Sequence, residues 1–180
     1  GKLEAAAAAY GRAIALDPGN AGIHSNLGNV LRDLGRRDEA IAAQERSLEL
    51  DPANHAASYN MALLLRDLGR WAEAVVAYRA YLAGHPQDFG ILVQLGNCAK
   101  ECADYLTAHQ AYADALELQP EDADLHLQMG HLFKLMGRRR DARLAYGEAM
   151  RLDPVNLAAQ RELEVMRAIG ADQFHLPLNK

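Results

Sequence analysis

Five of the six prolines in this chain stand 34 residues apart, at Pro18, Pro52, Pro86, Pro120 and Pro154. A strict period of this length is typical of a stacked repeat, in which each unit is one supersecondary element. Proline has no backbone N–H and clashes with the preceding helical turn, so each one should follow a helix that has ended. The spacing therefore predicts a series of similar helical units.

Other columns keep the same period when a repeat is counted as residues 21–54. The eighth position is small in every copy: Gly28, Ala62, Gly96 and Gly130. The twentieth is alanine: Ala40, Ala74, Ala108 and Ala142. The fifteenth is glycine except in the third copy: Gly35, Gly69, Ala103 and Gly137. Small residues allow two helices to approach closely and glycine favours the turn between them, so each unit is predicted to be helix A, turn, helix B.

This pattern resembles the tetratricopeptide repeat, whose leucine–glycine, alanine, aromatic and late proline positions have counterparts here. The resemblance covers residues 1–156 and implies an all-α fold, a right-handed α-solenoid of helix-turn-helix repeats. Two departures are expected to weaken packing locally. These are Ala103 at the turn of the third repeat and Gly84 late in helix B of the second.

The repeat pattern divides the chain into seven segments. Residues 1–18 match the second half of a unit, so the array is expected to have been cut from a longer one. Four full repeats follow at 21–54, 55–88, 89–122 and 123–156. Residues 157–170 are predicted to form a capping helix, and residues 171–180, which contain Pro177, an extended or disordered tail.

Composition excludes several classes of function. The net charge of −5 argues against a general nucleic-acid binder. No apolar run approaches the roughly 20 residues of a membrane span, and no signal peptide is visible. We therefore expect a cytoplasmic protein without membrane insertion, although the truncated repeat at the N-terminus leaves open a signal lost with the missing part.

Catalytic, metal and cofactor sites are not predicted. Cys98 and Cys102 fall in a column that is apolar in the other repeats, where cysteine acts as a small hydrophobe. The histidines form no set with metal-ligand spacing. No nucleophile motif or phosphate-binding glycine loop is present. The sequence therefore predicts a protein that is not an enzyme.

The polar side of helix A carries the strongest functional signal. In tetratricopeptide arrays this side lines a concave groove. Its sixth, ninth and twelfth positions form ladders of amide and basic side chains. The candidate peptide-binding residues are Asn26, Asn29, Arg32, Asn60, Arg66, Gln94, Asn97, Lys100, Gln128, His131 and Lys134.

An amide side chain offers one acceptor and one donor group, which match a peptide backbone, so the ladder could hold an extended chain. The basic column would then favour acidic ligands. A structural alternative explains the same residues without a ligand. In it Arg32 and Arg66 pair with Asp33 and Asp67, and the amides hydrogen-bond between adjacent helices.

The asparagine column resembles the groove of nucleocytoplasmic O-linked N-acetylglucosamine transferases, where such residues hold substrate peptide. Residues 95–101 and 122–142 also look like repeats that precede bacterial glycosyltransferase domains. The leading hypothesis is a non-catalytic interaction scaffold that binds an extended peptide or a partner helix. The alternative is the recognition arm of a larger glycosyltransferase, and self-association through the open N-terminal edge is a third possibility.

Overall fold

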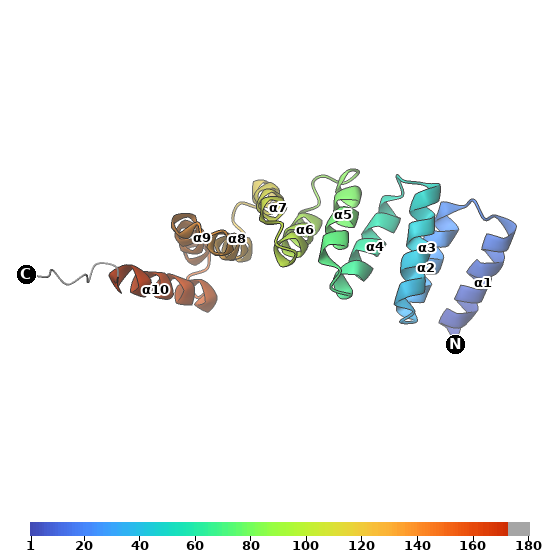
Figure 1. The fold of residues 1–180 in the computed structure, drawn as a ribbon, viewed down its shortest axis with the longest axis horizontal. Helices are drawn as coiled ribbons and strands as arrows, with labels where there is room; N and C mark the ends of the chain where they lie inside the picture. The colour runs from blue at the N-terminus through green and yellow to red at the C-terminus, as the bar shows by residue number, and fades with distance from the viewer. Residues whose placement is uncertain (173–180) are drawn as a thin grey trace, which may run out of the picture. The chain divides into compact units, whose positions relative to one another are not determined.

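The structure is a computed structural model that describes residues 1–172 of the 180-residue chain. These residues form helices throughout, joined by short turns (Figure 1). The helices are α1 (Lys2–Leu16), α2 (Ala21–Asp33), α3 (Arg37–Leu50), α4 (His55–Asp67), α5 (Trp71–Leu82), α6 (Phe89–Glu101), α7 (Tyr105–Leu118), α8 (Ala123–Leu135), α9 (Arg139–Leu152) and α10 (Leu157–Asp172). The predicted all-α fold is confirmed.

The last helix is longer than predicted. It continues to Asp172, two residues beyond the expected end at Gly170. The rest of the predicted tail, residues 173–180, lies outside the described part of the chain.

A capping residue precedes every helix A, and the sequence analysis overlooked this column. Asn20, Asn54, Asp88, Asp122 and Asn156 each accept a hydrogen bond from a backbone N–H in the first turn. The five bonds measure 2.7–3.2 Å. Such a cap stabilises a helix by about 1 kcal/mol. Since the caps recur every 34 residues, they fix where each helix A begins.

The turn between helices A and B requires a left-handed backbone. Gly35, Gly69 and Gly137 have φ of 77°, 71° and 73°. Ala103 holds the same place with φ of 60°. A residue with a Cβ is strained in this region, so the third repeat carries a cost that the other turns avoid.

Small residues at position eight make room for the side chain at position twenty-four of helix B. A Cβ on Gly28 would lie 2.6 Å from Nε2 of Gln44. A Cβ on Gly130 would overlap the ring of Tyr146. The glycine and the large residue therefore form one packing unit in each of these repeats.

The chain divides into two compact units, residues 1–104 with α1–α6 and residues 105–180 with α7–α10. In the first unit Leu64, Leu65 and Tyr78 are buried at 0–2% exposure. Cys98 is buried at 1%, in agreement with a core role. One core cluster of the second unit contains Leu127, Ala142, Tyr146, Ala149 and Ala159.

The two histidines at position four have a structural role. Nε2 of His24 lies 3.1 Å from the carbonyl oxygen of Pro18, and Nε2 of His126 lies 2.9 Å from that of Pro120. A carbonyl only accepts, so each imidazole donates to the turn before its own helix. The periodic proline and the histidine six residues later thus belong to one turn.

Candidate functional site

The candidate residues lie on one side of the A helices, which we call the helix-A face and define by positions six, nine and twelve. In the first unit this face contains Asn26, Asn29, Arg32, Asn60, Leu63, Arg66, Gln94, Asn97 and Lys100, on α2, α4 and α6. In the second unit it contains Gln128, His131 and Lys134 on α8. Most of these side chains are half-buried, while Asn26 and Lys134 are exposed.

Arg32 connects α2 to α4. Its Nη1 donates to Oδ1 of Asn60 at 3.3 Å. Its Nε and Nη2 both donate to Oδ1 of Asp33 at 3.3 Å. The guanidinium is therefore held between an acid on its own helix and an amide on the next helix A.

Arg66 repeats this arrangement between α4 and α6. Its Nη1 donates to Oε1 of Gln94 at 3.3 Å, and its Nε and Nη2 donate to Oδ1 of Asp67 at 3.1 and 2.8 Å. The hydrogen bond to Asp67 raises the pKa of Arg66. We call each arginine with its aspartate and amide an arginine bridge.

The second unit has a related contact. Nζ of Lys134 on α8 donates to Oε2 of Glu162 on α10 at 2.6 Å. The partners are 28 residues apart, the same separation as in the two arginine bridges. Position twelve thus reaches the sixth residue of the next helix A, and in the last pair a salt bridge replaces the amide contact.

The arginine bridges determine which hydrogen-bonding groups of the helix-A face are already occupied. The side-chain carbonyls of Asn60 and Gln94 already accept from the arginines. Within residues 1–172 their amide nitrogens have no acceptor, so these NH₂ groups keep their capacity to donate. Asp33 and Asp67 lie against the arginines and offset most of their charge. The contacts of the structural alternative are therefore present.

In two repeats the side chain at position nine is hydrogen-bonded to a side chain of helix B. Nε2 of Gln44 donates to Oδ1 of Asn29 at 3.2 Å, and Oη of Tyr146 lies 3.0 Å from Nδ1 of His131. Both pairs are 15 residues apart. Asn29 and His131 therefore have a supporting role in addition to any contact with a ligand.

Lys100 on α6 is the last position-twelve residue of the first unit. Burial lowers its pKa, and the neighbouring Glu101 acts in the opposite direction. Like the arginines, it stands directly before an acidic residue. The positive column is thus matched by a negative one throughout α2, α4 and α6.

The sequence did not reveal a cluster of aromatic and imidazole rings at the start of α4 and the end of α5. His85 stacks on Tyr81 with ring centroids 4.5 Å apart, and the ring of His55 meets that of His85 edge-on at 5.4 Å. Oη of Tyr81 donates to Asp88 at 3.0 Å. Since His55 and His85 recur in no repeat column, periodicity gave no signal for this cluster.

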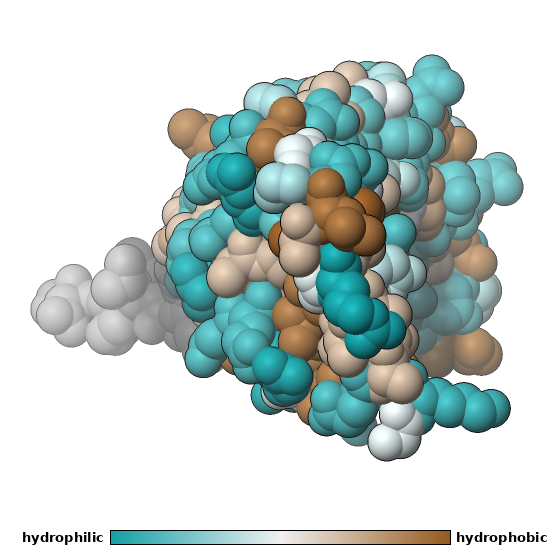
Figure 2. Space-filling model, turned by 90° about the vertical axis from the view of Figure 1, so that its right-hand side faces the viewer, coloured by the Kyte–Doolittle hydropathy of each residue, from teal (hydrophilic) through white to brown (hydrophobic). Residues whose placement is uncertain are grey.

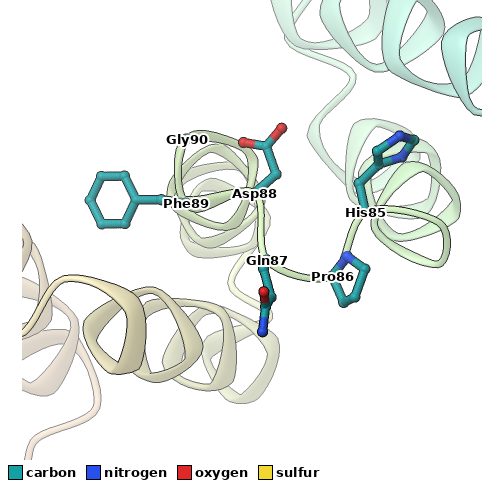
Figure 3. A pocket seen from close by; sticks show the side chains of 6 residues that line it. All are labelled: His85, Pro86, Gln87, Asp88, Phe89 and Gly90. Carbon is teal, nitrogen blue, oxygen red and sulfur yellow. The ribbon is translucent and has the colours of Figure 1, made fainter.

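A cavity of about 580 Å³ opens beside this cluster, and Figure 3 shows its six lining residues, 85–90. Asp88 supplies its carboxylate, but one oxygen caps α6 and the other accepts from Tyr81. His85 donates through Nδ1 to the carbonyl of Tyr81 at 3.3 Å. The charged group of this cavity is therefore already engaged within the chain.

A second cavity, of about 440 Å³, lies between α8 and α9. Its floor contains Phe133 and Leu144. Arg138 stands over the Phe133 ring at 4.6 Å and donates to Asp141 at 2.7 Å. The charge of this arginine is therefore engaged within the chain, although its side chain stays 46% exposed.

Helix α1 exposes apolar side chains to solvent. It contains no buried residue, and Leu3 and Leu16 are 40% and 89% exposed. Figure 2 views the chain from this end, where pale and dark brown atoms gather on the surface. This is the surface on which the self-association hypothesis depends.

Among residues 1–172, no three histidine, cysteine or acidic side chains come together as metal ligands. Over the same residues, none of the helices has the length and apolarity that a membrane crossing demands. Both findings concern the described part of the chain alone.

Three sequence profiles match the chain: one described as TPR repeat over residues 1–35, and two described as tetratricopeptide repeat over residues 25–89 and 123–156. No curated protein matches the sequence significantly. The resemblance to O-linked N-acetylglucosamine transferases receives no support from these comparisons.

Several solved structures share the fold. YrrB, described as a TPR protein with an unusual peptide-binding site, is 21% identical with a TM-score of 0.73, covering 93% of this chain and 87% of YrrB. MamA from Desulfovibrio magneticus RS-1 is 20% identical with a TM-score of 0.69, covering 87% and 89%. A tetratricopeptide repeat protein from Parabacteroides merdae is 20% identical with a TM-score of 0.70, covering 94% and 67%. The profile matches, which together cover residues 1–89 and 123–156, identify the repeats of this chain as tetratricopeptide repeats.

Proposed function

We propose that this chain is a non-catalytic interaction scaffold that holds an extended peptide segment of a partner protein on its helix-A face. The observation that carries the proposal is the pair of arginine bridges. They fix the amides of Asn60 and Gln94 in one orientation, with the carbonyl occupied and the NH₂ group available. Two donors on successive repeats suit the carbonyls of an extended backbone.

Pre-organisation supports this proposal over a purely structural role. A side chain that is already held loses less entropy when a ligand binds. The two arginine side chains are still 33% exposed, so solvent screens the bridges, which by themselves contribute little to folding stability. The peptide-binding site named for YrrB is consistent with this use of the fold. An affinity of about 1 μM, or about −8 kcal/mol, is expected because ordering an extended peptide opposes binding.

Selection for acidic ligands is a weaker part of the proposal. Arg32, Arg66 and Lys100 would attract carboxylates, but an acidic residue follows each of them in the sequence. The arginine charges are largely compensated by Asp33 and Asp67. We therefore expect charge to tune binding and the amide donors to supply most of it.

The test begins with selection of peptides from a phage-displayed library of random linear sequences against the 180-residue chain. A selected peptide is then synthesised, and its affinity is measured by calorimetry for the wild type and for the double variant Asn60→Ala/Gln94→Ala. We expect affinity to fall at least tenfold, because both backbone donors are removed. The melting temperature should change little, since both side chains are partly exposed and their bonds to Arg32 and Arg66 are screened by solvent.

The matched control is Arg46→Ala/Glu49→Ala, which removes an exposed pair on α3 with an Nη1–Oε2 distance of 2.8 Å. It also deletes two partnered polar side chains, but from helix B. Affinity should be unchanged. Equal affinity of the wild type and the Asn60/Gln94 variant would show that the peptide binds elsewhere.

Two other hypotheses from the sequence remain proposals. A recognition arm of a larger glycosyltransferase would use the same helix-A face, and the complete reading frame would decide that question. Self-association would bury the exposed face of α1 against a second copy. Sedimentation velocity at several concentrations tests it, and a monomer at all of them would contradict it.

A further inference from the structure

The second repeat breaks a hydrogen-bonding rule that the first and fourth repeats follow. In those repeats the residue at position twenty-four bonds the residue at position nine, through Gln44–Asn29 and Tyr146–His131. In the second repeat the corresponding residues are Tyr78 and Leu63. Leucine has no group that can accept or donate.

Tyr78 shows the consequence of this break. Its side chain is 0% exposed, and its hydroxyl has no hydrogen-bond partner among the described residues. Burial raises the pKa of Tyr78 to about 12, while the charge of nearby Arg66 acts in the opposite direction. A buried polar group without a partner costs stability.

Leu63 occupies in the second repeat the position that Asn29 and His131 occupy in the first and fourth repeats. It is half-buried on α4, and on the same helix face Asn60 and Arg66 form parts of the two arginine bridges. Tyr59, one turn before Leu63, is also half-buried. In the first repeat the equivalent residues are Ser25 and Asn29, and among the four repeats the second is the one with an apolar residue at position nine.

We propose that Leu63 is a specificity-determining residue of the helix-A face and contacts an apolar side chain of the bound extended peptide. The inference rests on the proposed function and names the ligand more narrowly. The ligand class is an extended segment with an apolar residue at the point that crosses α4. Flanking backbone carbonyls would meet the amide donors of Asn60 and Gln94.

Leucine at position 63 deprives the chain of a possible hydrogen bond to Tyr78. Asparagine at this position would give Tyr78 a partner, as Asn29 does for Gln44. Where one repeat departs from the pattern of the others and loses stability by doing so, the departure is expected to serve a function. Burial of an apolar ligand side chain against Leu63 supplies such a function.

The experiment compares peptides selected by the wild type with those selected by Leu63→Asn from the same random linear phage-displayed library. Wild-type peptides should share one apolar position, and the variant should lose that preference. A synthesised wild-type peptide should bind Leu63→Asn about tenfold more weakly and Leu63→Met almost as well. Tyr78→Phe, which leaves the surface unchanged, should bind like the wild type.

Melting temperatures test the premise independently of any ligand. Tyr78→Phe should not lower the melting temperature of the wild type, but it should lower that of Leu63→Asn, where the hydroxyl has gained a partner. Equal effects in both backgrounds would overturn the premise. Unaltered peptide preference in Leu63→Asn would overturn the inference while leaving the proposed function intact. A library without any wild-type binder would overturn both.

Discussion

The imidazole of His55 lies directly against the α-carbon of Gly84. A Cβ on Gly84 would overlap three atoms of the His55 ring, and Nδ1 of His55 is held 3.1 Å from the carbonyl of Ala80. Other repeats carry leucine in the column of Gly84, at Leu16, Leu50, Leu118 and Leu152. The glycine was predicted to weaken packing locally. Instead, the missing side chain makes room for the histidine of the same repeat.

Gly84 was expected late in helix B, but α5 ends at Leu82 and Gly84 lies in the turn that follows. Gly84→Ala should nevertheless destabilise the chain. We expect a loss of about 1–2 kcal/mol, because the His55 ring must leave its hydrogen bond to relieve the overlap. Chemical denaturation measures this change. In the double variant His55→Ala/Gly84→Ala the glycine substitution should cost less than half as much. An equal cost in both backgrounds would show that the two side chains do not compete for one space.

Tyr146→Phe should cost about 1 kcal/mol of unfolding free energy. The change removes the hydroxyl that lies 3.0 Å from Nδ1 of His131. The chain then loses one hydrogen bond, whose net contribution to stability is about 1 kcal/mol. Guanidinium denaturation would detect the loss as a lower midpoint. Tyr78→Phe is the matched control, since it removes a hydroxyl that lacks a partner within the described chain. If both variants lost the same stability, the hydrogen bond between Tyr146 and His131 would contribute nothing to it.

Ala103→Gly should stabilise the chain by about 1 kcal/mol. The backbone of Ala103 has φ of 60°, where a Cβ is strained and glycine is not. Gly35→Ala is the reverse experiment at an equivalent turn, with φ of 77° and open space around the added Cβ. It should lose a similar amount, so thermal melts of the two variants should shift in opposite directions. Shifts of the same sign would contradict this account of the turn.

Stability should fall between about pH 10 and pH 12. Burial raises the pKa of Tyr78 to about 12, above its ordinary value of 10.0, so the folded chain keeps a proton that the unfolded chain releases. The stabilisation from this group is complete below pH 10 and is lost as pH rises through the folded pKa. The expected slope is about 1 kcal/mol per pH unit for one such tyrosine.

The measurement is chemical denaturation of the wild type and Tyr78→Phe at pH 9 and pH 11. Phenylalanine does not titrate, so the variant should lose less stability than the wild type between these values. Burial also raises the pKa of Tyr146. The stability of the Tyr78→Phe variant should therefore still fall somewhat as the pH rises. Identical pH dependence of the two proteins would contradict the assignment to Tyr78.

The architecture could be predicted from the sequence because its determinants are local and periodic. Proline, the turn glycines and the small residues of position eight act on their own turn or on the adjacent helix, and each recurs every 34 residues. The capping asparagines and aspartates were equally readable and were overlooked. Periodicity also placed the amide and basic residues on one face, which is the part of the site that the sequence could supply.

Only the tertiary structure decided how those residues are used. The Arg32–Asn60 and Arg66–Gln94 bonds join side chains 28 residues apart, and their existence depends on the spacing of successive A helices. The unpartnered hydroxyl of Tyr78 and the fit of His55 to Gly84 arise where one repeat departs from the others. A repeat pattern in the sequence shows only the features that all copies have in common. The energy of a departure depends on the side chains that packing brings against it, and these are not neighbours in sequence.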